Sequence, residues 1–220
     1  MERKLIYDNP LASANDVADF IREGTVNVSF PAGKMRLESV LDPTLGQKAN
    51  YVFWCPKEFP ADVQIEWDFQ PIKEPGLAML FFSAAGKAGT DMFSKELEPR
   101  TGEYQQYHHG DINAFHVSYF RRMWEEERSF HTCNLRKSYG FHLVAQGADP
   151  MPDADEIKAP YHIAVRKQGR AVQFAINDLE LFHFEDDGAS WGPLLAGGRI
   201  GFRQMAPLVA EYSNLKVYAL

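Results

Sequence analysis

The chain has 220 residues, of which 45% are hydrophobic and 24% charged, and its formal net charge is -7. This composition is ordinary for a soluble globule, and the length suits one large all-β domain or two small ones. The acidic balance argues against a nucleic-acid partner, because phosphate binding needs a basic face. The chain contains no run of about eighteen apolar residues, so we expect no membrane-spanning helix.

The start of the chain, MERKLIYDNPLASANDVADF, has no apolar core of signal-peptide length behind its early charges. Two cysteines are present, Cys55 and Cys133. Without a secretion signal we expect two free thiols rather than a disulfide, and a cytoplasmic location.

In chain order, the first predicted element is a short helix within residues 14–24, ANDVADFIREG, which has a polar start and a closing Gly24. The dominant later signal is the period of two that is typical of strands, and the segment 76–86 is apolar on both faces, as a central buried strand would be. The predicted strands are 26–30, 62–72, 76–86, 113–122, 140–147, 161–168, 171–178, 198–205 and 212–220. Strands 161–168 and 171–178 are predicted to pair as a hairpin. The segment 149–160, with three prolines, reads as a surface loop.

Alternation within these strands separates an apolar from a polar face. The apolar positions of three of the strands are predicted to form the core between two sheets: Val63, Ile65, Trp67, Phe69, Val172, Phe174, Ile176, Ile200 and Phe202. Many short strands, with no shift in composition along the chain, predict a single all-β sandwich over residues 1–220 in which two antiparallel sheets pack face to face.

Long motifs along almost the whole chain resemble the YesU-like family of bacterial proteins. They are YVFWCP, WDFQPI, GLAMLFFSAAG, GDINAFHVSYFRR, TCNLRKSYGFHL and GRIGFRQMAP. The resemblance implies a concanavalin A-like lectin/glucanase jelly roll with one concave sheet. It also implies a link to the use of pectin, notably rhamnogalacturonan. It implies no catalytic residues.

Residues 107–122, YHHGDINAFHVSYFRR, gather three histidines and two arginines in an acidic chain. Within the predicted strand 113–122, His116 and Arg122 lie on the face opposite the apolar side chains. The same alternation places His142 and Asp68 opposite the apolar faces of their own strands. Because a core does not accept unpaired charge, we expect these four side chains to face one concave groove.

The groove residues suggest two kinds of role. His116, His142 and Asp68 are candidate catalytic groups, since a histidine titrates near pH 6.5. The candidate substrate-binding residues are His108 and Arg136 at the rim, together with Arg122, Asn113 and Trp124. Arginine binds carboxylates in a bidentate manner, and an exposed tryptophan can stack on a sugar ring. An acidic oligosaccharide is therefore the expected partner.

Whether the protein is an enzyme remains open at this point. Glu66 and Asp68 resemble part of a jelly-roll hydrolase motif, but Gln70 stands where the motif needs a third carboxylate. Gln106 and His108 resemble a lyase element, for which Tyr119 or Tyr107 would supply the acid.

The alternative function is that of a non-catalytic sugar-binding or structural jelly roll, which could form a homodimer. The alternative for the polar cluster is a strand face that is simply solvated. No cofactor is expected. No metal is expected either, because the acidic loop 149–156 lacks the spacing of a calcium loop.

Overall fold

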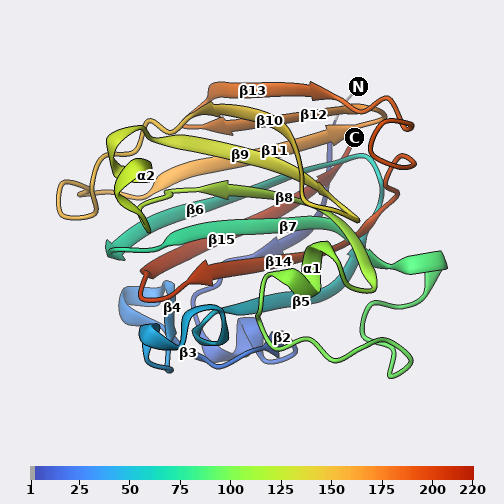
Figure 1. Ribbon diagram of the computed structural model, residues 1–220. Coiled ribbons are helices and arrows are strands. Elements are labelled where there is room, and N and C mark those ends of the chain that lie inside the picture. Colours follow the sequence, from blue (N-terminus) through green and yellow to red (C-terminus); the bar gives the residue numbers. More distant parts are fainter. Residues whose placement is uncertain (1–2) are drawn as a thin grey trace.

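The computed structural model describes residues 3–220 as two antiparallel sheets packed face to face (Figure 1). Sheet A has the strand order β13-β12-β11-β6-β15-β4-β3, with β1 paired to β15. Its strands are β1 (Lys4–Asn9), β3 (Val26–Ser29), β4 (Met35–Ser39), β6 (Val63–Lys73), β11 (Tyr161–Gln168), β12 (Ala171–Ile176), β13 (Leu179–Glu185) and β15 (Val209–Ala219).

Sheet B has the order β10-β9-β8-β7-β14-β5-β2. Its strands are β2 (Ile21–Glu23), β5 (Tyr51–Phe59), β7 (Leu77–Gly86), β8 (Ile112–Tyr119), β9 (Thr132–Ser138), β10 (His142–Ala148) and β14 (Gly198–Met205). Every strand pair in both sheets is antiparallel, so the predicted fold class of an antiparallel two-sheet sandwich is confirmed.

The helices are short and lie in the connections. They are α1 (Gln105–His108), α2 (Glu125–Ser129) and four 3-10 turns, η1 (Ala14–Val17), η2 (Pro31–Gly33), η3 (Pro43–Ala49) and η4 (Lys87–Gly89). The helix predicted within 14–24 is wrong beyond its first turn, because Ile21–Glu23 pairs with β5 instead. A segment this short gains little as an isolated helix, so pairing with a sheet decides its structure. None of the helices in residues 3–220 is long and apolar enough to cross a membrane.

The main core lies between the two sheets and is rich in aromatic side chains. Trp67 packs against Tyr119 and Phe202, with ring centroids 5.8 and 6.2 Å apart. All nine side chains predicted for this core are buried in it. The two thiols, Cys55 and Cys133, are also buried there and unpaired, as predicted.

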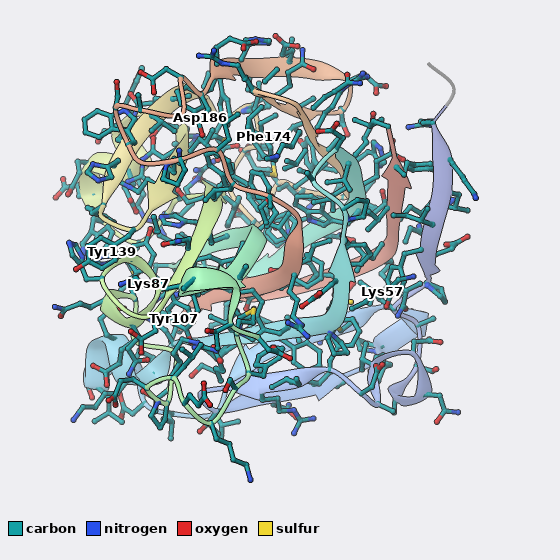
Figure 2. The ribbon with its side chains drawn as sticks, turned by 90° about the vertical axis from the view of Figure 1, so that its right-hand side faces the viewer. Lys57, Lys87, Tyr107, Tyr139, Phe174 and Asp186 are labelled. Atoms are coloured by element: carbon teal, nitrogen blue, oxygen red, sulfur yellow. The ribbon has the colours of Figure 1, made fainter. Side chains whose placement is uncertain are left out.

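A second apolar cluster lies on the outer face of sheet B, on the side away from sheet A. There the connection between β7 and β8, residues 87–111, folds back over the sheet, and its Tyr107 packs against Trp54 and Phe81. At the adjacent strand ends, which face the viewer in Figure 2, the Lys87 Nζ lies 3.9 Å from the centroid of the Tyr139 ring. The connection leaves only part of this outer face available to a ligand.

Candidate functional site

A pocket of about 150 Å³ lies on the uncovered part of the outer face of sheet B. Its floor comes from four neighbouring strands: Met79 from β7, Ser118 from β8, Asn134 and Arg136 from β9, and Arg203 from β14. These side chains point outward because the residues next to them along each strand point into the core. We refer to this hollow as the outer pocket.

Positive charge dominates the outer pocket, whose lining contains three arginines and one carboxylate, that of Glu127. Arg121 forms an ion pair with Glu127, whose second oxygen accepts a hydrogen bond from the backbone N–H of Met123 at 3.0 Å. Arg136 and Arg203 form no ion pair with any residue in the range 3–220. The lining therefore carries two more positive than negative charges.

Both uncompensated guanidinium groups are held in place by backbone oxygens and aromatic rings. The Nη1 of Arg136 donates to the carbonyl of Phe141 at 3.0 Å, and the guanidinium lies 3.7 Å from the Phe141 ring centroid. The Nη2 of Arg203 donates to Gln47 Oε1 at 3.0 Å and to the Gly102 carbonyl at 3.3 Å. The buried Nε and Nη1 atoms of Arg203 have no hydrogen-bond partner within the described chain.

Burial and mutual repulsion shape the titration of the site. Burial lowers the pKa of Arg136 and of Arg203, so each cation is held at a cost that an anion would relieve. Burial is the largest cause that lowers the pKa of His108, and the nearby charges of His109, Arg136 and Arg203 lower it further, to about 4. His108 is therefore a neutral imidazole at neutral pH.

Aromatic side chains form the mouth and one wall. Trp124 and Phe141 line the pocket and keep 46% and 45% of their surfaces exposed. Tyr104 covers the Arg203 guanidinium at 4.7 Å from ring centroid to Cζ, and burial raises its pKa to about 12. Exposed rings beside hydrogen-bonding groups are suited to a sugar, which presents an apolar ring face and a polar edge.

Three of the residues predicted for substrate binding lie at or beside the outer pocket. Arg136 and Trp124 line it. His108 packs against two further lining residues, with its ring centroid 4.9 Å from that of Tyr104 and 4.7 Å from that of Phe141. Three of the five residues predicted for substrate binding therefore come together at this pocket.

His116 lies below the pocket rather than in it. Its side chain is fully buried between Phe81 and Tyr104, at centroid distances of 5.2 and 5.4 Å. Neither ring nitrogen has a hydrogen-bond partner among residues 3–220. Burial, followed by Arg136, lowers its pKa, so the ring is neutral.

The predicted groove position of Arg122 is wrong. β8 ends at Tyr119, and Phe120 has a positive φ of 46°, which interrupts the alternation on which the prediction depended. Arg122 is fully buried, and its guanidinium donates to Asp149 Oδ2 at 3.1 Å and to the Met151 carbonyl at 2.6 Å. It holds the loop 149–160 against the end of the sandwich.

The predicted position of His142 is also wrong. In β10 it pairs with Lys137 of β9, and it stacks on Trp191 with ring centroids 4.4 Å apart. Together with Asn113 it lines a separate cavity of about 320 Å³ at the strand ends. The segment 140–147 has apolar residues on both faces, so the alternation did not identify the face that points to the core. Phe141 and Leu143, which were expected to face the core, are exposed.

Asp68 lies on the other sheet. Its strand β6 belongs to sheet A, where Asp68 accepts from Asn214 Nδ2 at 2.6 Å and contacts His162 Nδ1 at 3.1 Å. Glu66 lies on the same strand and pairs with Arg3. The expected grouping of His116, His142 and Asp68 in one groove is therefore wrong.

Sequence reasoning missed several pocket residues, among them Gln47, Tyr104 and Arg203, and it counted Arg121 in the positive cluster without selecting it as a site residue. Arg203 carried a usable signal, because in GRIGFRQM it alternates with Ile200 and Phe202, which were assigned to the core. Tyr104 carried none, since its position depends on how residues 87–111 fold back over the sheet. No group of three or more His, Cys, Asp or Glu side chains in the described chain is arranged to hold a metal ion.

Two antiparallel sheets with a charged, aromatic pocket on one outer face place the protein in the concanavalin A-like, galectin-like class of jelly-roll sandwiches. The chain belongs to the family described as "Domain of unknown function (DUF1961)", whose model matches residues 4–217.

Two relatives and one protein that shares only the fold illustrate how far the similarity extends. "Uncharacterized protein YesU" of Bacillus subtilis (strain 168) is 50% identical over 217 residues, covering 99% of this chain and 96% of the relative. A crystal structure from Bacillus subtilis, described as a protein of unknown function with galectin-like fold, matches with TM-score 0.95 and 49% identity over 100% of this chain and 97% of the other. The Bacillus licheniformis beta-glucanase shares the fold alone, with TM-score 0.59 and 12% identity over 99% and 95%.

Proposed function

We propose that the protein binds acidic oligosaccharides of the pectic, rhamnogalacturonan type in the outer pocket. The observation that carries this proposal is the pair of guanidinium groups, Arg136 and Arg203, that no carboxylate in the described chain neutralises. A carboxylate on the ligand would supply the missing counter-charge by pairing with the half-buried Arg136, and the fully buried Arg203 would add to the positive potential without contacting the ligand.

The rest of the lining supports a sugar rather than a simple anion. Trp124 and Phe141 offer exposed rings for stacking, while Asn134, Ser118 and Gln47 offer hydrogen-bonding groups to hydroxyls. The fold is shared with a beta-glucanase, and the likeness to the YesU-like family favours a pectic polysaccharide as the source of the ligand.

Titration calorimetry tests this proposal with Arg136→Gln, which removes one charge without touching the core. We expect Arg136→Gln to weaken binding of a uronate-containing oligosaccharide by about 1.5–3 kcal/mol, the range for a hydrogen bond to a charged group. Arg166→Gln is the matched control, because Arg166 is an exposed arginine on sheet A whose side chain donates only to Gln168 among the described residues. Equal losses in both variants would contradict the proposal.

A second candidate function is β-elimination of the bound uronate. Tyr119 and Tyr107, considered from the sequence as the acid, are both buried, and their hydroxyls contact Trp67 Nε1 and the Gly102 N–H. Tyr104 and the neutral His108 instead lie beside Arg136.

In this reaction Arg136 would offset the substrate carboxylate and His108 would take the C5 proton. As the C4–O bond breaks, the Tyr104 hydroxyl would protonate the leaving oxygen. New ultraviolet absorbance from the unsaturated product would establish elimination, and its absence with intact binding would leave a binding protein. Hydrolysis has less support, because Glu127 is the only carboxylate in the lining and glycosidases ordinarily use two.

We propose a cytoplasmic location, which suits two buried thiols that remain unpaired. Cell fractionation followed by immunodetection tests it, and recovery of the protein from the culture medium would contradict it.

A further inference from the structure

The outer pocket is closed on one side, because residues 87–111 and the loop that contains η3 cover the outer face of sheet B around β5 and β14. Val52 and Trp54 of β5 point outward from the sheet and are nevertheless fully buried, as is Arg203 of β14. Figure 1 shows this connection, with α1, lying across the lower strands of sheet B. A sugar chain cannot continue over this part of the sheet.

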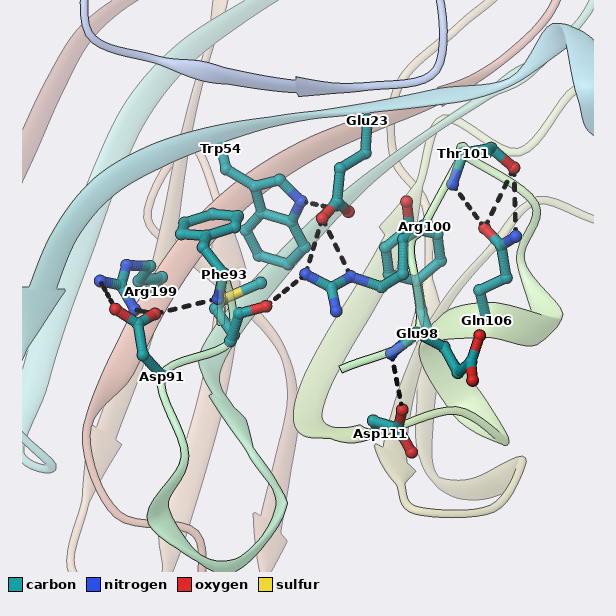
Figure 3. A network of polar contacts seen from close by, with 12 residues as sticks. Glu23, Trp54, Asp91, Phe93, Glu98, Arg100, Thr101, Gln106, Asp111 and Arg199 are labelled. Atoms are coloured by element: carbon teal, nitrogen blue, oxygen red, sulfur yellow. Dashed lines mark hydrogen bonds and ion pairs between the residues drawn. The ribbon is translucent and has the colours of Figure 1, made fainter. Parts of the chain in front are cut away.

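Several polar contacts hold this cover in place (Figure 3). The buried carboxylate of Glu23 accepts from Trp54 Nε1 at 2.8 Å and from Arg100 Nε at 2.9 Å. Arg100 also donates to the Met92 carbonyl at 2.6 Å. Near the start of the cover, Asp91 pairs with Arg199 of β14 at 2.9 Å. These contacts tie the cover to β2, β5 and β14, so it is a fixed wall.

The cover meets the outer pocket at Arg203. Its guanidinium is held by both covering segments, through Gln47 from η3 and the carbonyl of Gly102. At Gly102 a Cβ atom would lie 2.1 Å from the carbonyl oxygen of Asn50, so the two segments touch without space for a side chain. The pocket therefore has a blind end at Arg203.

The opposite side of the outer pocket is open. Three large apolar side chains keep about 45% of their surfaces exposed here: Phe141 just before β10, Leu143 in β10 and Trp124 just before α2. The cavity of about 150 Å³ is smaller than the roughly 300–1,000 Å³ of pockets that enclose drug-sized ligands. It has room for one sugar unit, whose neighbours must leave past Trp124 and Phe141.

From this one-sided closure we infer that the outer pocket recognises the terminal uronate unit of a chain, and not an internal stretch of the polymer. The inference rests on the proposed function and adds to it the part of the ligand that is recognised. The terminal carboxylate lies against the half-buried guanidinium of Arg136, at the end of the pocket where the fully buried Arg203 adds its positive charge, and the remaining units lie outside the pocket.

The number of protein molecules bound per sugar chain tests this inference. Calorimetry would compare a short pectic oligosaccharide with a long pectic polymer of known chain concentration. We expect one protein molecule per chain for both ligands. Several protein molecules on each long chain would overturn the terminal inference while leaving the proposed function standing. No binding to any uronate-containing ligand would overturn both.

Selective methyl esterification locates the recognised carboxylate directly. In a defined oligosaccharide, the ester on one terminal uronate should weaken binding roughly ten- to hundredfold, whereas esters on internal units should leave affinity unchanged. Loss of affinity with internal esters alone would refute the inference. Because these measurements use the unaltered protein, failure of a variant to fold does not affect them.

Discussion

The substitution Arg122→Met should lower the free energy of unfolding, and this effect does not involve the outer pocket. The side chains of Arg122 and Asp149 are both completely buried and form an ion pair at 3.1 Å. Removing the arginine leaves the Asp149 carboxylate buried with only the Met151 N–H, at 3.1 Å, as its hydrogen-bond donor. Breaking a buried pair on one side costs about 3–5 kcal/mol, and we expect the free energy of unfolding to fall by that amount.

Urea denaturation at neutral pH measures this loss, and its dependence on pH checks the cause. Burial raises the pKa of Asp149, while Arg122 lowers it. Without Arg122 the pKa rises further, so the folded variant takes up a proton at a higher pH than the folded wild type. The stability deficit of the variant should therefore shrink as the pH falls from neutral to mildly acid. An unchanged urea midpoint for Arg122→Met would refute the reasoning, as would a deficit that grows in acid.

Three further predictions concern buried or partly buried groups. The free energy of unfolding of His116→Leu should not fall more than about 1 kcal/mol below that of the wild type, because the substitution removes a buried polar group whose lack of a partner costs about 1–3 kcal/mol. A loss of more than about 1 kcal/mol in urea denaturation would contradict the burial described. The pKa of His108, about 4 in the free protein, should rise when an acidic oligosaccharide neutralises the nearby arginines. Binding in acid should therefore be accompanied by proton uptake. A His108 pKa that the ligand does not change in an NMR titration would count against the site. Cys55 and Cys133, whose pKa values burial raises, should resist thiol reagents until the protein unfolds, and rapid labelling of the native protein, followed by mass spectrometry, would contradict this.

The fold was predictable because a sandwich core repeats one simple rule along many strands. Trp67, Phe174 and Phe202 occupy the apolar parity of their strands, and each lies between the sheets as expected. The rule fails where a strand ends or carries apolar residues on both faces. Arg122 follows a residue with positive φ, and His142 lies in a strand with an irregular register between Leu143 and Ala145.

The site was less predictable because it depends on which strands become neighbours. Asp68 has the expected alternation, but β6 belongs to sheet A, and no local pattern reveals the sheet to which a strand belongs. Arg136 and Trp124, which were selected for their chemistry, do line the outer pocket. Tyr104 and Gln47 lie in connections whose path over sheet B is set by long-range contacts such as Glu23 with Arg100, which a single sequence does not display.

The most direct test of the proposed function is calorimetric comparison of one uronate-containing oligosaccharide with its carboxyl-reduced, neutral analogue, using the wild type and Arg136→Gln. Because Arg136 and Arg203 have no carboxylate partner in the described chain, we predict that the wild type binds the acidic ligand roughly ten- to hundredfold more tightly than the neutral one. This preference should shrink markedly in Arg136→Gln. Equal affinity of the wild type for the two ligands would contradict a site built for acidic sugars.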